Sequence, residues 1–135
     1  MFEVPIEPGK VREFALAVEA PTARHYGADA VVTPTFLTIA GLAWEPAAEK
    51  AALDFDLSRT LHGSEEYEFP AGLPRAGQTL SVTTRVERRF ERAGERGGQL
   101  WFAVVAREFR DTAGELVAVQ RSTAIELGDV PAEKS

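Results

Sequence analysis

The segment TPTFLTIAGLAW, residues 33–44, carries the signals of a buried helix. Thr33 is a residue type that caps helices, and Pro34 suits the first helical position because its fixed φ and missing N–H cost nothing there. Apolar residues follow on nearly every face of the expected helix, and a helix that is apolar all round has to be covered on all sides. The sequence therefore predicts a helix from Pro34 to Trp44 inside the core.

After residue 60 the apolar period changes from helical to alternating, which is typical of strands. The four strand-like segments are LHGSEEYEF (61–69), TLSVTTRVERRF (79–90), QLWFAVVAREF (99–109) and ELVAVQRSTAIEL (115–127). Glycine-bearing turns join the last three, so an antiparallel meander is expected. The alternation assigns these side chains to the inner face: Leu61, Tyr67 and Phe69 in the first segment, and Leu80, Val82, Val86 and Phe90 in the second.

The N-terminal segment EPGKVREFALAVEA, residues 7–20, predicts a surface helix. Pro8 lies in its first turn, apolar residues recur at helical spacing, and Pro21 ends the pattern. FEVPI, residues 2–6, fits a short edge strand at most. Helices followed by long antiparallel strands define an α+β domain. Ferredoxin-like and cystatin-like folds compete, but four strands after one buried helix favour a hot-dog fold, an antiparallel sheet wrapped around a central helix.

Length and composition indicate one domain. A chain of 135 residues can bury a single core without disulfides or metals. We expect this domain to span residues 1–128, with residues 129–135 as a flexible tail. There are no cysteines, which excludes disulfides, thiolate metal sites and cysteine nucleophiles. No apolar run approaches the ~18 residues of a membrane span, and the N-terminal residues do not resemble a signal peptide. We therefore expect a cytoplasmic protein that does not bind membranes.

The formal net charge of −6 argues against nucleic acid as a partner, because phosphate binding needs a basic surface. The segment RVERRFERAGER, residues 85–96, is a local exception. Its arginines alternate with glutamates, so a solvated strand and turn is the expected reading. An acidic acyl-carrier protein could still use it.

Three stretches together resemble the MaoC-like dehydratase family: VREFALAVEAPTARHYGADAVVTPTFLTIAGL (11–42), LHGSEEYEFPAGLPRAGQTLSV (61–82) and GQLWFAVVAREFRDTAGELVAVQRSTAIE (98–126). The likeness is to its N-terminal-type, fungal fatty-acid-synthase-like dehydratase domain, and to the non-catalytic subunit of (3R)-hydroxyacyl-ACP dehydratases. It covers roughly residues 2–127. It implies a hot-dog fold, two such domains paired side by side, and acyl-CoA or acyl-ACP thioesters as ligands.

The resemblance also indicates where catalytic residues would lie. Active members supply an Asp and, five positions later, a His, as acid and base for hydration of an enoyl thioester. Aligned from Phe14, the histidine position falls on His25 and the aspartate position on Ala20. Alanine cannot act as a base, and Glu19 is one residue out of register. The resemblance therefore implies a broken dyad. His25 is a candidate catalytic residue, with Tyr26 and Asp29 as possible assistants, or an ordinary loop histidine.

The thioester oxygen in this family is met by backbone N–H groups near the start of the buried helix. Here the candidates are the N–H groups of Thr35 and Phe36, where the positive end of the helix favours negative charge. The alternative is that this segment merely begins a core helix.

His62, close to Glu65 and Glu66, is either a substrate-contacting residue or a strand-entry histidine that bonds the backbone. Two histidines without shared spacing predict no metal site. No cofactor is expected, because a glycine-rich phosphate loop is absent. Ser58 and Ser64 lack an arranged histidine–acid pair, which argues against a serine hydrolase.

The leading hypothesis is a non-catalytic or impaired hot-dog subunit of an enoyl-CoA or enoyl-ACP hydratase or (3R)-hydroxyacyl dehydratase. It would pair with a catalytic MaoC-like hot-dog protein and help shape the acyl tunnel. A self-sufficient homodimeric hydratase or thioesterase that uses His25 is the first alternative. An acyl-thioester binding module without chemistry is the second.

Overall fold

The computed structural model describes residues 1–20, 22–40 and 53–128. Within these residues the elements are, in chain order, β1 (Phe2–Pro5), α1 (Pro8–Ala17), η1 (Ala23–His25), η2 (Phe36–Thr38), η4 (Leu57–Arg59), β2 (Thr60–Glu68), β3 (Thr79–Ala93), β4 (Gln99–Arg110) and β5 (Leu116–Leu127). The predicted N-terminal helix and edge strand are confirmed as α1 and β1. None of the helices in the described ranges is long and apolar enough to cross a membrane.

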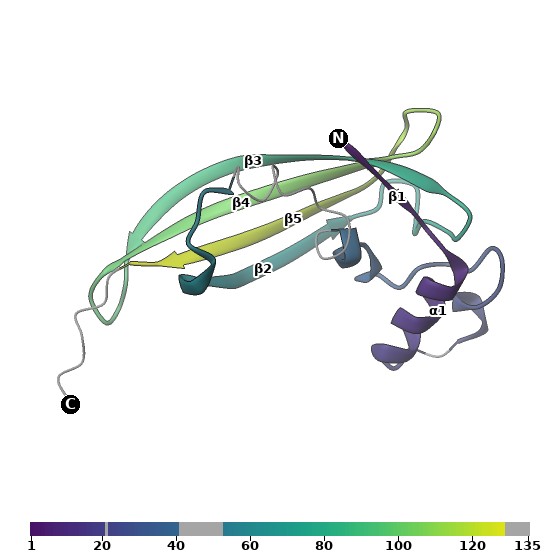
Figure 1. Ribbon diagram of the computed structural model, residues 1–135, viewed down its shortest axis with the longest axis horizontal. Helices are drawn as coiled ribbons and strands as arrows, with labels where there is room; N and C mark the ends of the chain where they lie inside the picture. Colours follow the sequence, from purple (N-terminus) through teal and green to yellow (C-terminus); the bar gives the residue numbers. More distant parts are fainter. Residues whose placement is uncertain (21, 41–52, 129–135) are drawn as a thin grey trace.

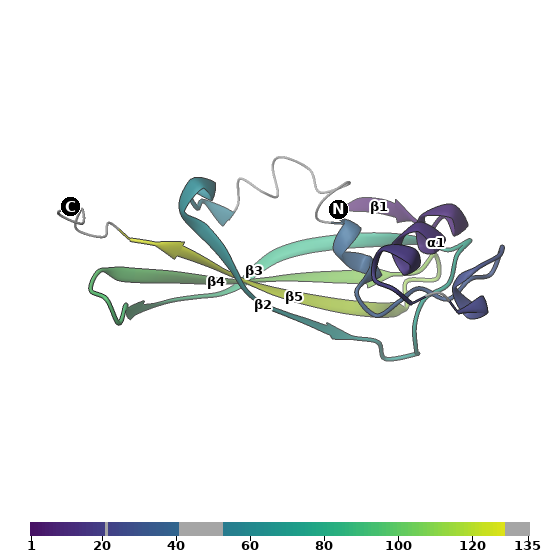
Figure 2. The same ribbon diagram turned by 90° about the horizontal axis from the view of Figure 1, so that it is seen from below.

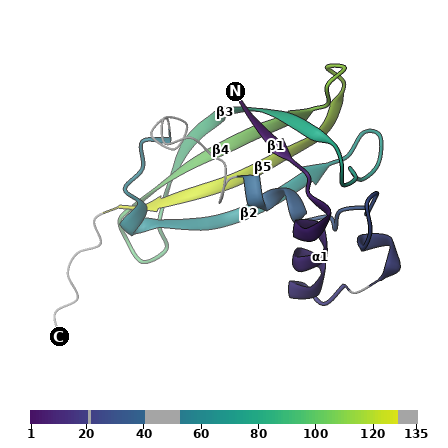
Figure 3. The same ribbon diagram turned by 45° about the vertical axis from the view of Figure 1, so that its right-hand side comes forward.

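The strands form one antiparallel sheet in the order β1-β3-β4-β5-β2. Strands β3, β4 and β5 are the predicted meander, and they are long and curved (Figures 1 and 2). The short β1 and the longer β2 form the two edges. Figure 3 shows α1 and the loop after it beside the end of the sheet where β3 begins. The η2 helix and α1 lie on one face of the sheet, which we call the inner face.

The apolar core lies between this end of the sheet and η2. Phe36 and Leu37 are fully buried in it, together with Val82 and Phe109 from the sheet. The Phe14 ring of α1 meets the Phe36 ring edge to face, with 5.7 Å between centroids. Burying each large apolar side chain stabilises the fold by about 1.5–3 kcal/mol, so these contacts hold η2 and α1 against the sheet.

A β-bulge in β2 corrects the expectation that Leu61 shares a face with Tyr67. The register shifts between His62 and Ser64, so that Leu61 lies opposite Ile125 while Tyr67 lies opposite Gln120. Residues 125 and 120 point to opposite faces of β5 because side chains alternate along a strand. A Cβ at Gly63 would meet Ile125 Cδ1 at 2.8 Å. Leu61 is therefore on the outer face and 55% exposed.

A second bulge, in β3, corrects the inward placement of Phe90. The register shifts between Val86 and Arg88. Val86 lies opposite Val105, but Phe90 lies opposite Phe102 on the other face of β4. The Phe90 and Phe102 rings stack there with their centroids 4.6 Å apart. A single extra residue thus reverses the alternation for the rest of the strand.

The predicted helix from Pro34 to Trp44 is described only in part. Phe36–Thr38 form a 3₁₀ turn, and residues 41–44 lie outside the described ranges, as do Pro21 and the predicted tail, residues 129–135. The prediction that the Thr33 side chain caps the helix is wrong, because its Oγ1 has no hydrogen-bond partner in the part of the chain that the structure describes. The Thr33 carbonyl instead accepts from the Phe36 N–H at 3.1 Å.

Candidate functional site

His25 ends the short η1 helix and is only 7% exposed. Its Nδ1 lies 2.6 Å from the Val31 carbonyl oxygen. A carbonyl only accepts, so Nδ1 carries the proton and Nε2 is the acceptor in the neutral ring. Asp29, suggested by the sequence as the group that orients this ring, is not its partner in this bond. The backbone of Val31 has that role.

The loop that carries His25 is fixed to the segment that precedes β3. The Val31 N–H donates to Arg24 O at 2.7 Å, and the Ala76 N–H donates to Ala30 O at 2.8 Å. Val31 also forms an isolated antiparallel bridge with Arg75. These bonds satisfy backbone groups on both sides of the loop. Backbone hydrogen bonds to the segment before β3 therefore hold the loop that carries His25 in place.

Ala20 and Glu19 follow the end of α1. The Ala20 N–H donates to Ala15 O at 2.8 Å, and Glu19 adopts a left-handed conformation with φ of +57°. That conformation is common where a helix stops. Among the described residues, no ion pair joins His25 to a carboxylate. Tyr26, named with His25 in the sequence, lies instead below the Arg12 guanidinium, 5.2 Å from ring centroid to Cζ.

The two predicted oxygen-binding N–H groups differ in availability. Phe36 donates its N–H to Thr33 O. Thr35 is exposed, and none of the described residues accepts from its N–H. Its carbonyl accepts from the Thr38 N–H at 3.1 Å. Thr35 therefore has the free donor of the pair, and the assignment of either residue to a substrate stays a prediction.

His62 lies near the start of β2 and is exposed. Its Nε2 is 3.1 Å from Glu65 Oε2. Figures 1 and 3 place the start of β2 near one end of the sheet and the His25 loop near the other. The structure therefore does not bring the two histidines together.

A cluster of polar side chains lies on the inner face, and it was not predicted from the sequence. We name it the Glu65 cluster; its members are Thr38, Glu65, Tyr67, Gln120 and Ser122. Glu65 Oε1 accepts from Ser122 Oγ at 3.0 Å, from Tyr67 OH at 3.2 Å and from Gln120 Nε2. Tyr67 OH also bonds Thr38 Oγ1 of η2. The register of β2 on β5 brings these residues together. No spacing within either strand could have revealed it.

Burial raises the pKa of Tyr67 from 10.0 to about 12, and the negative charge of Glu65 adds to the effect. The neutral phenol is thus the form that the folded protein favours. A neutral hydroxyl can donate to Glu65 while it accepts from Thr38. The cluster therefore forms a continuous chain of hydrogen bonds from β5 through β2 to η2.

This pKa predicts a loss of stability at alkaline pH. Because the pKa is raised on folding, the contribution of neutral Tyr67 is complete below the unfolded value near 10.0 and is lost as the pH rises toward 12. Denaturant unfolding from pH 9 to 12 should show a decrease in the wild type that is absent in Tyr67→Phe. In a Tyr26→Phe variant, which leaves one tyrosine, tyrosinate absorbance should titrate near pH 12. A midpoint near 10 would contradict the prediction.

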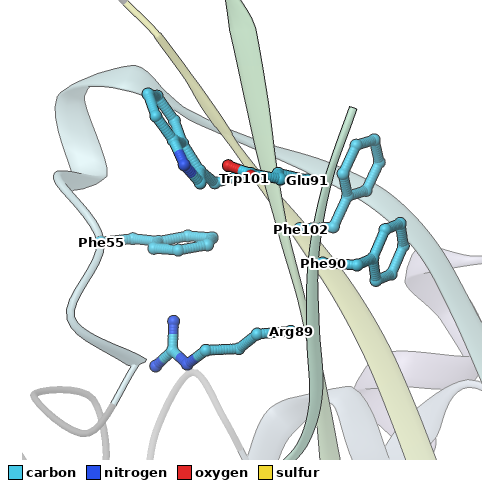
Figure 4. A pocket seen from close by; sticks show the side chains of 6 residues that line it. All are labelled: Phe55, Arg89, Phe90, Glu91, Trp101 and Phe102. Carbon is cyan, nitrogen blue, oxygen red and sulfur yellow. The ribbon is translucent and has the colours of Figure 1, made fainter. Parts of the chain in front are cut away.

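A shallow pocket of about 340 Å³ opens toward the far end of β3 and β4. Its lining residues are Phe55, Arg89, Phe90, Glu91, Trp101 and Phe102. Figure 4 shows Phe55, Arg89 and Trp101 on one side of the strands, and Phe90 with Phe102 on the other. The Arg89 Cζ lies 5.5 Å from the centroid of the Phe55 ring. None of the site residues predicted from the sequence lines this pocket.

Within the described ranges, no group of three or more histidines, aspartates or glutamates could hold a metal ion.

A family model described as the FAS1-like dehydratase domain region matches residues 2–120. This confirms the resemblance drawn from the sequence. No curated protein matches the chain.

Several solved structures have the same fold. The HadBC (3R-hydroxyacyl-ACP dehydratase) complex from Mycobacterium tuberculosis matches with a TM-score of 0.74 and 19% identity, covering 92% of this chain and 90% of that chain. The ChsH1–ChsH2 complex from the same organism matches with a TM-score of 0.71 and 12% identity. The match covers 98% of this chain and 84% of that chain. A MaoC-like dehydratase matches with a TM-score of 0.75 and 22% identity. The match covers 93% of this chain and 39% of that chain. At these identities the likeness shows the fold alone, and it confirms the predicted α+β hot-dog fold.

Proposed function

The chain belongs to the family of FAS1-like dehydratase domain regions, and on this premise we propose that it is a supporting subunit of an acyl-thioester hydratase or (3R)-hydroxyacyl dehydratase. Its partner is a MaoC-like hot-dog chain that carries the complete Asp–His dyad. Its ligand is an acyl-CoA or acyl-ACP thioester. The chain itself contributes binding surface and fold, and the partner contributes the acid and the base.

The observation that carries this proposal is the state of the predicted dyad. The position that should hold an aspartate is Ala20, which has no group to exchange a proton. His25 keeps its place but is buried, and its Nδ1 bonds the Val31 backbone. That bond serves the loop whether or not a substrate is present. Without a carboxylate at position 20, His25 alone cannot supply both the acid and the base that hydration needs.

The β2 edge supports the pairing. Among the described residues, β2 pairs with β5 alone, so its other side leaves backbone groups without a strand partner. Leu61 on β2 and Leu57 on the adjoining η4 are both exposed. An uncovered edge with apolar side chains is where soluble proteins commonly bind a partner. Two of the similar structures are complexes of two named chains.

The Thr35 N–H supports binding of a thioester. It is a free backbone donor on an exposed turn next to the buried Phe36. Such a donor stabilises the negative charge that builds on a thioester oxygen. The acyl chain would then extend along the inner face of the sheet.

The pairing is tested by light scattering of the purified chain at micromolar concentration, alone and as the complex recovered from its own cells. The chain is expected to be dimeric in both cases, with itself or with the partner. Leu61→Lys should raise the dissociation constant at least about tenfold, because a charge at a buried apolar contact costs more than 1.4 kcal/mol. Leu16→Lys is the matched control, since Leu16 is 50% exposed but lies on α1.

A monomer at micromolar concentration in both preparations would contradict the proposal. So would equal effects of Leu61→Lys and Leu16→Lys, because the β2 edge would then have no special part in assembly.

A further inference from the structure

Four strands place a polar side chain in one row across the inner face. Thr84 on β3 lies opposite Arg107 on β4, Arg107 lies opposite Gln120 on β5, and Gln120 lies opposite Tyr67 on β2. We call these four residues the polar row. Phe109, two positions from Arg107 and on the same face, belongs to the apolar core. A row of polar side chains therefore crosses the inner face next to the apolar core.

Gln120 is only 2% exposed, and half of its amide has no partner. Its Nε2 donates to Glu65 Oε1 and, at 3.2 Å, to Tyr67 OH. A carboxylate only accepts, so the amide orientation is fixed by this contact. Gln120 Oε1 therefore points away from Glu65, and no group of the described residues bonds it.

Thr84 repeats this pattern two strands away. Its Oγ1 is buried and also lacks a hydrogen-bond partner within the described ranges. Arg107, buried between them, brings a positive charge into the same row. Buried polar groups in proteins are nearly always bonded, because an unmet acceptor loses its hydration without compensation. The row thus carries hydrogen-bonding capacity that the described part of the fold does not use.

The row is close to the segment that carries Thr35. Tyr67 OH, at the β2 end of the row, bonds Thr38 Oγ1 in η2. Thr38 in turn donates its N–H to Thr35 O. A ligand whose thioester oxygen met the Thr35 N–H would therefore have the polar row nearby.

We propose that the polar row binds a hydrogen-bond-donating group, a hydroxyl or an amide N–H, of the acyl thioester. The inference rests on the proposed function and names the ligand chemistry of the inner face. Gln120 Oε1 can only accept, so the ligand has to donate there, and Thr84 Oγ1 can do either. A saturated hydrocarbon chain would leave both groups unmet. The donor comes either from a substituent on the acyl chain or from the amides of the pantetheine arm.

The test is calorimetric binding to the full chain with three probes: dodecanoyl-CoA, dodecanoyl-CoA with a hydroxyl on its terminal carbon, and pantetheine alone. The variant is Thr84→Val, which keeps the shape and removes Oγ1. Because that hydroxyl has no partner to lose, the melting temperature should be unchanged or higher. Thr83→Val is the matched control, since Thr83 directly precedes Thr84 on β3 and is exposed on the outer face.

If the donor is on the acyl chain, the hydroxylated probe should bind the wild type about tenfold more tightly than dodecanoyl-CoA, and Thr84→Val should abolish this preference. If the donor is in the pantetheine arm, pantetheine alone should bind, and Thr84→Val should weaken it by a similar factor. Thr83→Val should change neither.

Equal binding of every probe to wild type and Thr84→Val would overturn the inference, since the row would then hold only water. Absence of binding by all three probes would overturn it too. The proposed function is judged separately, by assembly and by turnover in the complex, so its failure is distinguishable from failure of this inference.

Discussion

The isolated chain is expected to leave crotonyl-CoA unchanged, while the complex with its catalytic partner hydrates it at least about 100-fold faster. The factor follows from the contribution of a positioned acid–base group, about 10²–10⁴ in rate. Ala20 cannot supply that group, and no ion pair within the described ranges gives His25 a carboxylate partner in its place. The measurement is the loss of enoyl-thioester absorbance, with free CoA followed in parallel to detect hydrolysis.

The control for this prediction is His25→Gln in the complex, which should retain the rate within about twofold if His25 only supports the loop. Turnover by the isolated chain that His25→Gln abolishes would contradict the proposal and identify a self-sufficient hydratase. Release of free CoA without loss of the enoyl bond would identify a thioesterase. Saturable binding without turnover in any complex would identify a binding module.

Phe36→Ala is expected to lower the free energy of unfolding by about 3–5 kcal/mol, because the substitution removes a fully buried ring and leaves a cavity. Phe36 begins η2 and contacts Phe14 of α1 edge to face. Urea unfolding should show a lower midpoint with an unchanged slope.

Leu16→Ala is the control for this prediction. Leu16 is half exposed on α1, so its truncation should cost no more than about 0.5 kcal/mol. A loss in Phe36→Ala as small as in Leu16→Ala would show that η2 does not anchor the core.

Hydrophobic period made α1, β1 and the β3–β4–β5 meander predictable, because local spacing sets which face of an element is apolar. The same period failed at Leu61 and Phe90. A bulge at Gly63 separates Leu61 from Tyr67, and a bulge near Glu87 separates Val86 from Phe90; one extra residue reverses the alternation of faces across it. A bulge depends on how one strand pairs with another, so it cannot be predicted from the sequence of a single strand.

The candidate site divides in the same way. The sequence placed His25, Ala20 and Thr35 by resemblance, and the roles of these residues stay predictions. It suggested Asp29 as the group that orients His25, whereas the structure gives Val31 O. It noted Glu65 only as a neighbour of His62. The bonds from Gln120 and Ser122 to Glu65 were not predictable, because more than 50 positions separate these residues from Glu65.

By itself the sequence determined the family, the α+β class and the absence of a carboxylate at position 20, because these follow from residue identity and local spacing. Only the tertiary structure decided that the two histidines lie apart, that a polar row crosses the inner face at Gln120, and that Thr84 and Gln120 have hydrogen-bonding groups that the described residues do not meet. The physical reason is strand register. It sets which side chains oppose each other across the sheet, and packing of distant segments fixes it.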